Sequence, residues 1–162
     1  MFDSKVVVVT GGANGIGAAT CRAFAAHGPV DIVVNNVGHW VRVTPFHRST
    51  PEHWDSILDV NLRHVLLVSR AFIDDMLERG SGVIVNVSSI EGVRAYPSDP
   101  VYAASKAAVN HFTASMAIAY GRRGIRVVGI APDITNTGQV VYDESVQADP
   151  RWSWWYRRCR RR

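Results

Sequence analysis

Residues 5–17 read KVVVVTGGANGIG, and this stretch decides the fold. The β-branched run at 5–9 is typical of a strand buried on both faces, as in a parallel sheet. Helix-forming sequence follows at 18–27 and stops at Gly28-Pro29. Glycines between strand and helix permit a tight turn, and the helix N-terminus offers N–H groups to a pyrophosphate. A tight turn without a ligand is the alternative for this loop taken alone.

Further apolar runs predict strands at 31–34, 83–87 and 125–130. Ser49 and Glu52 have the spacing of a capping box, which predicts a helix from there to about Arg79. Asp99 and Pro100 predict the N-cap and first residue of another helix, which reaches about Tyr120. Residues 139–142 are either a strand or part of a loop.

The alternation of strands and helices indicates the fold class. It predicts an α/β protein with a Rossmann-like doubly wound parallel sheet, truncated to about four recognisable strands. The length of 162 residues suits one ordinary domain.

The basic charge is confined to one end of the chain. Residues 1–150 contain 12 Lys and Arg and all 14 acidic residues, whereas residues 151–162 contain six arginines. We therefore expect a mildly acidic Rossmann-type domain over 1–150 and a Trp/Arg-rich tail over 151–162 outside the core fold. Such a tail could bind nucleic acid through arginine and tryptophan, but a solvated terminus is the preferred interpretation.

No apolar run approaches the roughly 18 residues that span a bilayer, and the first residues lack a signal peptide's pattern. We expect a cytoplasmic protein without a membrane partner. Cys21 and Cys159 stand far from any Cys/His cluster with metal-ligand spacing, so two free thiols are expected and no metal site.

Tyr102 and Lys106 lie four residues apart, on one face of the predicted helix. A phenol has an ordinary pKa near 10, and a neighbouring ammonium lowers it by favouring phenolate. A buried tyrosine beside a solvated lysine is the alternative for the pair alone. Lys5 and Lys106 are the only lysines in the chain, which favours a chemical role.

Ser88 and Ser89 end the predicted strand at 83–87, at the sheet edge where parallel strands present groups to ligands. A hydroxyl there can bind a substrate carbonyl. Either serine alone is more simply a turn residue.

Together these features resemble the short-chain dehydrogenase/reductase family over about residues 4–150. Residues 10–17 are similar to the family's Thr-Gly-x-x-x-Gly-x-Gly, and residues 35–38 to its Asn-Asn-Ala-Gly with Val for Ala. Ser89 stands thirteen residues before Tyr102, as the family's serine often does. The resemblance implies catalytic roles for Asn61, Ser89, Tyr102 and Lys106. It implies cofactor contacts for Gly11, Asn14, Gly15, Ile16, Gly17, Asn35, Asn36, Gly38, Tyr102, Lys106, Pro132, Thr135 and Thr137.

The resemblance implies hydride transfer between NAD or NADP and the carbonyl or hydroxyl carbon of a small alcohol or ketone, with 3-oxoacyl and cyclic compounds among the candidates. Tyr102 would exchange the proton and Ser89 would hold the oxygen. Lys106 would lower the pKa of Tyr102 and bind the nicotinamide ribose, and Asn61 would position a water. His39, Trp40, Arg94 and Tyr96 are candidates for a substrate pocket or simply for the surface. A homo-oligomer is also implied.

The chain departs from the family in three places. Gly28-Pro29-Val30 joins elements that the family separates by two βα units, and the omitted second strand normally ends in the residue that distinguishes NAD from NADP. Asp133 replaces the usual Gly after Pro132, and the segments beyond do not match the family. We therefore expect an internally deleted, C-terminally altered member. A catalytically inactive fragment that acts by association or through its basic tail is the alternative function. A halohydrin-dehalogenase-like lyase is disfavoured by Lys106 and the glycine loop.

Overall fold

A computed structural model of the chain describes residues 5–10, 29–39, 44–95 and 99–133. Residues Met1–Pro132 form one compact unit, and Asp133–Arg162 form a second, of which only Asp133 is described. The glycine-rich loop, the helix expected at 18–27, the segment 139–142, both cysteines and the division expected at residue 150 lie outside the described residues.

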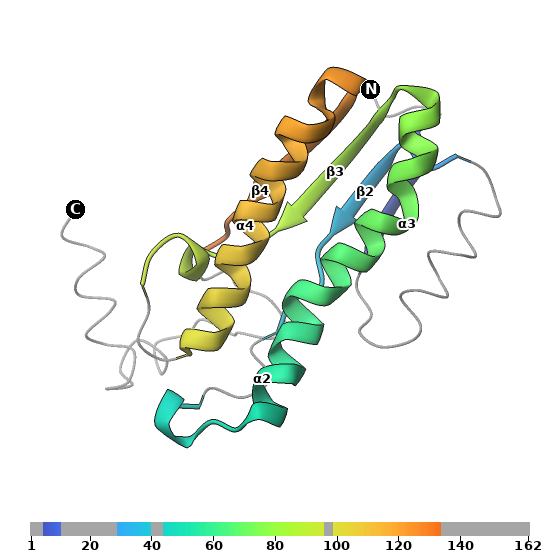
Figure 1. Cartoon of the computed structure of the whole chain (residues 1–162). Coiled ribbons are helices and arrows are strands. Elements are labelled where there is room, and N and C mark those ends of the chain that lie inside the picture. Colours follow the sequence, from blue (N-terminus) through green and yellow to red (C-terminus); the bar gives the residue numbers. More distant parts are fainter. Residues whose placement is uncertain (1–4, 11–28, 40–43, 96–98, 134–162) are drawn as a thin grey trace, which may run out of the picture. The chain divides into compact units, whose positions relative to one another are not determined.

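Four parallel strands form one sheet in the order β1-β2-β3-β4 (Figure 1). They span Val7–Thr10, Ile32–Asn35, Gly82–Val87 and Ile125–Ile130. Each agrees within two residues with a predicted strand. At the carboxyl end of the sheet, Thr10, Asn35, Asn86 and Gly129 are partners in register on the four strands. The α/β parallel sheet is the one expected from the sequence.

The first long helical region consists of α2 (Pro51–Leu58), a π-helical turn (Asp59–Arg63) and α3 (His64–Arg79). The N-cap is Thr50, whose side chain accepts a hydrogen bond from the N–H of His53, so the predicted cap at Ser49 is wrong by one residue. The hydroxyl of Ser49 instead makes two other hydrogen bonds. It donates to the Phe46 carbonyl and accepts from Trp54 Nε1. Gly80 ends α3 in the left-handed conformation, as expected of a C-terminal glycine.

Helix α4 (Pro100–Tyr120) begins as predicted, with Asp99 as its N-cap and Pro100 as its first residue. A short 3-10 turn at Gly121–Arg123 leads into Gly124, which has a φ of 83°. A Cβ at Gly124 would clash with the Gly80 carbonyl oxygen, so the turns after α3 and α4 meet closely there. None of the described helices is long and apolar enough to cross a membrane.

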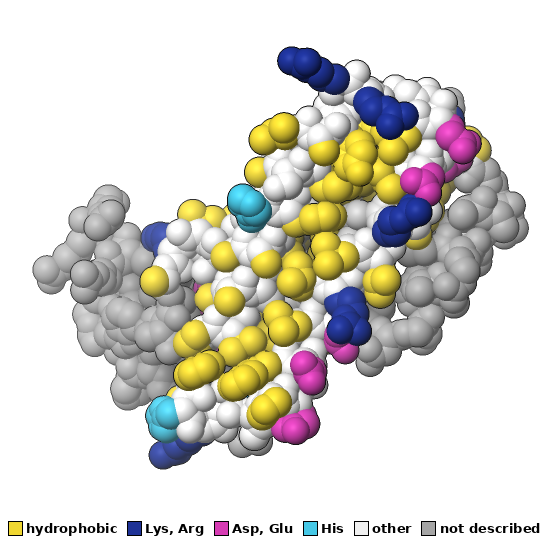
Figure 2. All heavy atoms as spheres, viewed as in Figure 1, with side chains coloured by type: hydrophobic (Ala, Val, Ile, Leu, Met, Phe, Trp, Pro, Cys, Tyr) yellow, Lys and Arg dark blue, Asp and Glu magenta, His cyan; other side chains and the backbone are white. Residues whose placement is uncertain are grey.

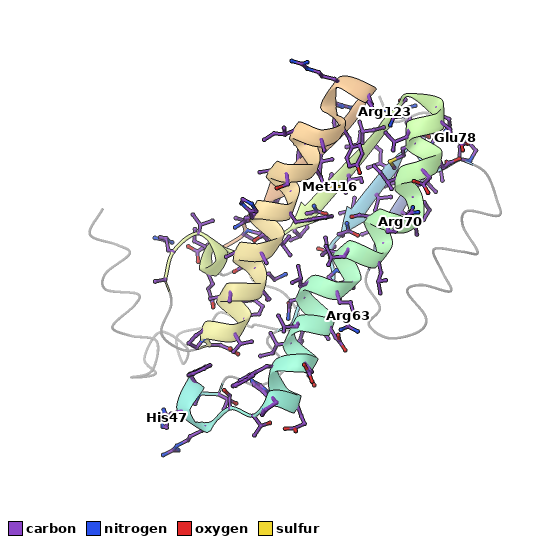
Figure 3. The ribbon with its side chains drawn as sticks, in the orientation of Figure 1. His47, Arg63, Arg70, Glu78, Met116 and Arg123 are labelled. Atoms are coloured by element: carbon purple, nitrogen blue, oxygen red, sulfur yellow. The ribbon has the colours of Figure 1, made fainter. Side chains whose placement is uncertain are left out.

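Helices α3 and α4 lie on the same face of the sheet (Figure 1). The core forms between them and the strands, from Val33, Ile84, Phe72, Met76 and Ile125 among others. Met116 of α4 packs against this core, whereas Arg63 of the π-helical turn and Glu78 of α3 project away from α4 (Figure 3). Burial of these apolar side chains holds α3 and α4 against this face of the sheet.

The opposite face of the sheet has no cover from the described helices. Val9 is 60% exposed and Ile130 is 52% exposed, although strand residues of this type are usually buried. Alternation along β1 places Val8 and Thr10 toward the helices and Val7 and Val9 on the other face.

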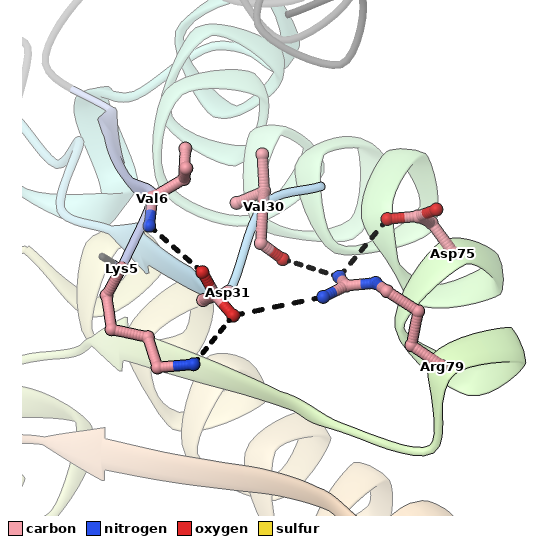
Figure 4. A network of polar contacts seen from close by, with 6 residues as sticks. All are labelled: Lys5, Val6, Val30, Asp31, Asp75 and Arg79. Carbon is pink, nitrogen blue, oxygen red and sulfur yellow. Dashed lines mark hydrogen bonds and ion pairs between the residues drawn. The ribbon is translucent and has the colours of Figure 1, made fainter. Parts of the chain in front are cut away.

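A polar network ties the amino-terminal ends of β1 and β2 to the end of α3 (Figure 4). The Asp31 carboxylate accepts from Val6 N and Lys5 Nζ, each at 3.0 Å, and lies 3.9 Å from Arg79. Arg79 also donates to the Val30 carbonyl at 2.7 Å and to Asp75 at 3.1 Å. The hydrogen bond from Val6, followed by that from Lys5, lowers the pKa of Asp31.

Candidate active site

The candidate site begins at the carboxyl ends of β1 and β2. Thr10 Oγ1 donates to the Val34 carbonyl at 3.4 Å and accepts from the Asn36 N–H at 3.2 Å. This threonine therefore fixes the point where the chain leaves β2 for the segment 36–39. That segment carries Gly38 and His39, which contact two of the predicted catalytic residues.

Beneath this edge, a buried polar network crosses from β2 to α4. Asn35 Nδ2 donates to Asn86 Oδ1 at 2.8 Å and to Ser69 Oγ at 3.2 Å. Asn86 Nδ2 donates to Thr113 Oγ1 at 2.9 Å, and Thr113 donates to the Val109 carbonyl. Asn35 is 0% exposed and its amide nitrogen holds the framework together, whereas its Oδ1 has no hydrogen-bond partner among the described residues. The cofactor contact expected of Asn35 stays a prediction.

Asn61 lies in the π-helical turn between α2 and α3, where a helix widens by one residue. Its Oδ1 accepts from the His39 N–H at 3.0 Å, and its Nδ2 donates to the His39 carbonyl at 2.7 Å and the Ile57 carbonyl at 3.0 Å. The fully buried Asn61 side chain thus binds the backbone of His39 like a neighbouring strand and holds the 36–39 segment in place.

Ser89 and Tyr102 meet at the end of β3. Ser89 caps the short 3-10 turn Ile90–Gly92, accepting from the Glu91 N–H at 3.2 Å. Tyr102 lies in the first turn of α4, is only 9% exposed, and its phenol is close enough to Ser89 for the serine side chain to act on its pKa. Two hydroxyl groups therefore stand together at the sheet edge, in position to hold one oxygen atom of a substrate.

Lys106 lies one turn after Tyr102 and is 2% exposed. Its Nζ is 5.8 Å from the centre of the Tyr102 ring and donates to the Val87 carbonyl at 3.2 Å. A Cβ at Gly38 would stand 2.6 Å from this Nζ and 3.3 Å from Asn61 Oδ1, so both polar atoms border the same small volume. The glycine is needed there because a side chain would enter it.

The backbone of Lys106 is held by two groups from the loop after β3. Ser88 Oγ donates to the Lys106 carbonyl at 2.9 Å. Gly92 packs so closely that a Cβ there would lie 2.6 Å from the carbonyl carbon of Lys106. The loop that carries Ser89 and the helix that carries Tyr102 and Lys106 are therefore fixed to each other.

The pKa of Tyr102 differs from our expectation. The sequence leads us to expect that Lys106 lowers the pKa of Tyr102. Burial instead raises this pKa, and the negative charges of Glu91 and Asp99 raise it further. The interaction with Ser89 acts in the opposite direction and lowers the pKa, but it does not outweigh these effects. Burial also lowers the pKa of Lys106, to about 8. Since the ammonium is itself disfavoured by burial and bonded to Val87, it does not offset the effects that keep the phenol protonated.

Three titratable residues near this site were not predicted as part of it. Glu91 and Asp99 act on Tyr102 through their charge. Burial lowers the pKa of His64 to about 4, and the charge of Lys106 acts in the same direction. The positions of Glu91 two residues after Ser89, and of Asp99 at the predicted N-cap, were the only signals in the sequence.

Lys106 still has hydrogen-bonding capacity for a ligand. An ammonium group has three N–H donors. In the described part of the chain, Lys106 Nζ donates one hydrogen bond, to the Val87 carbonyl. The unused donors border the volume beside Gly38. Hydroxyl groups of a bound molecule fit this arrangement, as a ribose would supply.

The structure brings together Asn61, Gly38, Ser89, Tyr102 and Lys106. Asn36 is exposed beside this cluster, and the Pro132 carbonyl accepts from the Ile90 N–H at 2.9 Å, which joins the end of β4 to the Ser89 loop. His39 and Arg94 are exposed. The remaining candidates lie outside the described residues: Gly11, Asn14, Gly15, Ile16, Gly17, Trp40, Tyr96, Thr135 and Thr137.

Comparison of the sequence with known proteins points to one family. The family model described as short chain dehydrogenase matches residues 22–147, more than half of the chain. The chain is 44% identical over 116 residues to 3beta-hydroxysteroid dehydrogenase 1 of Eggerthella lenta. These 116 residues are 71% of this chain and 44% of that protein. It is 38% identical over 141 residues to an acetoacetyl-CoA reductase of an Acinetobacter species, covering 85% of this chain and 56% of that protein.

Solved structures give the same result. A gluconate 5-dehydrogenase from Burkholderia cenocepacia, crystallised with NADP and tartrate, matches with a TM-score of 0.74 at 34% identity, over 86% of this chain and 53% of that one. A 3-oxoacyl-[acyl-carrier protein] reductase from Brucella melitensis with bound NAD matches with a TM-score of 0.67 at 32% identity, over 72% of this chain and 47% of that one.

The chain spans about half the length of the relatives it matches. The residues that the family model matches include β2, β3 and β4 and the helices that carry the Asn61, Ser89, Tyr102 and Lys106 cluster. The family match and the arrangement of these side chains agree, and the chain belongs to the short-chain dehydrogenase family.

Proposed function

We propose that this chain is an NAD(P)-dependent oxidoreductase that transfers a hydride between nicotinamide and the carbonyl or hydroxyl carbon of a small alcohol or ketone. The observation that carries the proposal is the convergence of Ser89, Tyr102 and Lys106 with Asn61 at the carboxyl edge of the sheet. Relatives named as reductases or dehydrogenases of hydroxyl or keto compounds support the reaction class.

Reduction of a ketone needs a hydride at carbon and a proton at oxygen. When bound, the dinucleotide would supply the hydride. Ser89 and Tyr102 would bind the ketone oxygen, and Tyr102 would donate its phenolic proton to that oxygen as the hydride reaches carbon. Because burial and the neighbouring carboxylates raise the pKa of Tyr102, the phenol is in the protonated form that this direction requires.

Tyr102 then needs a proton to return to its starting state. Lys106 Nζ and Asn61 Oδ1 border the volume beside Gly38, in which one water could bridge them. Protons from solvent would reach the phenolate by this route, with Lys106 as the nearest donor. In alcohol oxidation the same groups would carry the proton in the opposite direction.

Lys106 would hold the nicotinamide ribose through its unused donors. The glycine-rich loop at 11–17 would bind the pyrophosphate, as the sequence resemblance implies. Both NAD and NADP appear with solved relatives, so the proposal covers either dinucleotide.

Cofactor binding and chemistry can be tested separately. Titration with NADH and with NADPH, followed by tryptophan fluorescence, should show saturable binding of at least one of them. Tyr102→Phe should retain this binding and lower ketone reduction about 100-fold or more, because it removes the proton donor. Tyr120→Phe, at the other end of α4, is the matched control and should leave the rate unchanged.

The competing function is a catalytically inactive chain that acts by association. A folded chain that binds neither dinucleotide would favour it, as would a Tyr102→Phe variant with unchanged turnover. Val9 and Ile130 are exposed on the sheet face that the described helices do not cover. This exposed apolar face is the observation that supports the alternative function.

We also propose that the chain forms a homo-oligomer. Hydrophobic side chains gather on the outer face of α3 and α4, edged by charged residues (Figure 2). Leu67 of α3 is 57% exposed and Ile118 of α4 is 84% exposed. A second copy packed on this face would bury both. Light scattering coupled to size-exclusion chromatography should show a dimer or larger, which Leu67→Glu should dissociate.

A further inference from the structure

Asp99 is a buried carboxylate beside the candidate active site that the proposed reaction does not use. The residue is 3% exposed and precedes Pro100, the first residue of α4. Its Oδ1 accepts from the Tyr102 N–H at 3.1 Å and so caps the helix. Its charge acts on the Tyr102 phenol, together with that of Glu91. The carboxylate therefore lies at the start of the helix that carries Tyr102, in contact with the Tyr102 backbone.

The second oxygen of Asp99 has no donor. Oδ2 is buried and accepts no hydrogen bond from the described residues. No Lys or Arg in the described part of the chain forms an ion pair with Asp99; the nearby Lys106 donates to Val87 instead. A buried carboxylate oxygen without a donor is costly, and proteins rarely leave one so.

The helix cap uses only one of the two carboxylate oxygens of Asp99. Capping needs one acceptor, which Oδ1 provides, and Asn or Ser would cap α4 as well without a buried charge. The unused acceptor is thus an additional feature at the start of the helix that carries Tyr102.

On the basis of the proposed function, we propose that Asp99 is a specificity-determining residue whose Oδ2 accepts a hydrogen bond from a hydroxyl or ammonium group close to the reacting carbinol of the substrate. The substrate class is then vicinal diols and amino alcohols, with the corresponding ketones. Glu91 adds a second negative charge near Tyr102, which disfavours an anionic group at the same place.

The test measures binding by the full chain and does not need turnover. The dissociation constants of trans-cyclohexane-1,2-diol, trans-2-aminocyclohexanol and cyclohexanol are measured by NMR titration. The diol, the amino alcohol or both should bind roughly tenfold or more tightly than cyclohexanol, as a hydrogen bond to a carboxylate provides. A preference for one of the two identifies the donor as hydroxyl or ammonium.

Asp99→Asn should remove that preference and leave cyclohexanol binding unchanged, because asparagine keeps the cap and loses the charge. Asp99→Ser should do the same and provides a second variant if asparagine disturbs the fold. Asp74→Asn removes one exposed charge from α3 and should change nothing. Equal binding of the three alcohols, binding of none, or a preference that survives both Asp99 variants would overturn the proposal. Failure of the proposed function would instead appear as absent dinucleotide binding or as unchanged turnover in Tyr102→Phe.

Discussion

Gly38 lies directly against the ammonium of Lys106: a Cβ on Gly38 would stand 2.6 Å from Nζ. This contact joins the segment after β2 to the middle of α4, across the site. The clashing atom is the end of a flexible side chain, so Lys106 can move away from a larger residue. A substitution at Gly38 therefore acts on the position of the ammonium more than on the fold.

Gly38→Ala should displace Lys106 and lower dinucleotide affinity or ketone reduction about tenfold or more, with a loss of stability of about 1 kcal/mol or less. Binding by fluorescence titration and the free energy of unfolding are measured on the same preparation. Gly121→Ala is the matched control, since a Cβ there would meet nothing within 4 Å. Unchanged affinity and rate in Gly38→Ala would mean that the position of the ammonium does not matter.

Gly92 makes a different kind of contact with the same lysine. A Cβ at Gly92 would lie 2.6 Å from the Lys106 carbonyl carbon and 2.8 Å from the Ala107 nitrogen, both backbone atoms of α4. Because a helix backbone cannot rotate away, Gly92→Ala should reduce the free energy of unfolding by about 1–3 kcal/mol and also lower activity. Urea unfolding measures the first effect. Full stability in this variant would show that the loop after Ser89 can move independently of α4.

The fold was largely predictable because its signals are local. The strands at 83–87 and 125–130 are continuous apolar runs, and Asp99-Pro100 marks the start of α4 as expected. The cap before α2 was placed at Ser49 instead of Thr50 because both residues can cap a helix. The hydroxyl of Ser49 is taken by Phe46 and Trp54, a choice that depends on tertiary contacts.

The site was predictable in membership but not in electrostatics. The family resemblance implied the four residues Asn61, Ser89, Tyr102 and Lys106, and the structure brings them together in space, while their catalytic roles stay a prediction. The direction of the shift in the pKa of Tyr102 depends on burial and on the placement of Glu91 and Asp99. Sequence spacing carries no information on burial, so the effect of Lys106 was overestimated.

The charge of Glu91 provides a pH test. A like charge disfavours phenolate, so Glu91→Gln should lower the pKa of Tyr102. Alcohol oxidation needs the phenolate, and its rise with pH should therefore move to lower pH in the variant. The pH profile of kcat/KM measures this. An unchanged profile would mean that the Tyr102 proton does not control the rate.

Asp31 provides a test of stability at the opposite end of the sheet. Its pKa is lowered in the folded chain, chiefly by the Val6 N–H, so it stabilises the fold above its ordinary pKa of about 4 and loses this effect as the pH falls through the lower folded value. Asp31→Asn should lower Tm at neutral pH, and the difference should shrink below pH 4. Asp74→Asn, which removes an exposed carboxylate, should have little effect on Tm at either pH. A difference for Asp31→Asn that is constant with pH would argue against a charge effect.

We expect that the buried charge of Lys106 lowers the free energy of unfolding of the chain. Burial lowers its pKa to about 8, so between pH 8 and about 10.5 the unfolded chain binds more protons than the folded one and stability rises with pH. Lys106→Met keeps the length and apolar stem of the side chain and removes the buried charge. At pH 7 it should raise the free energy of unfolding by about 1–3 kcal/mol and abolish activity, which urea unfolding and a ketone reduction assay measure. The pH dependence between 8 and 10.5 should weaken in the variant. A destabilised Lys106→Met would instead show that the hydrogen bond to Val87 outweighs the burial of the charge.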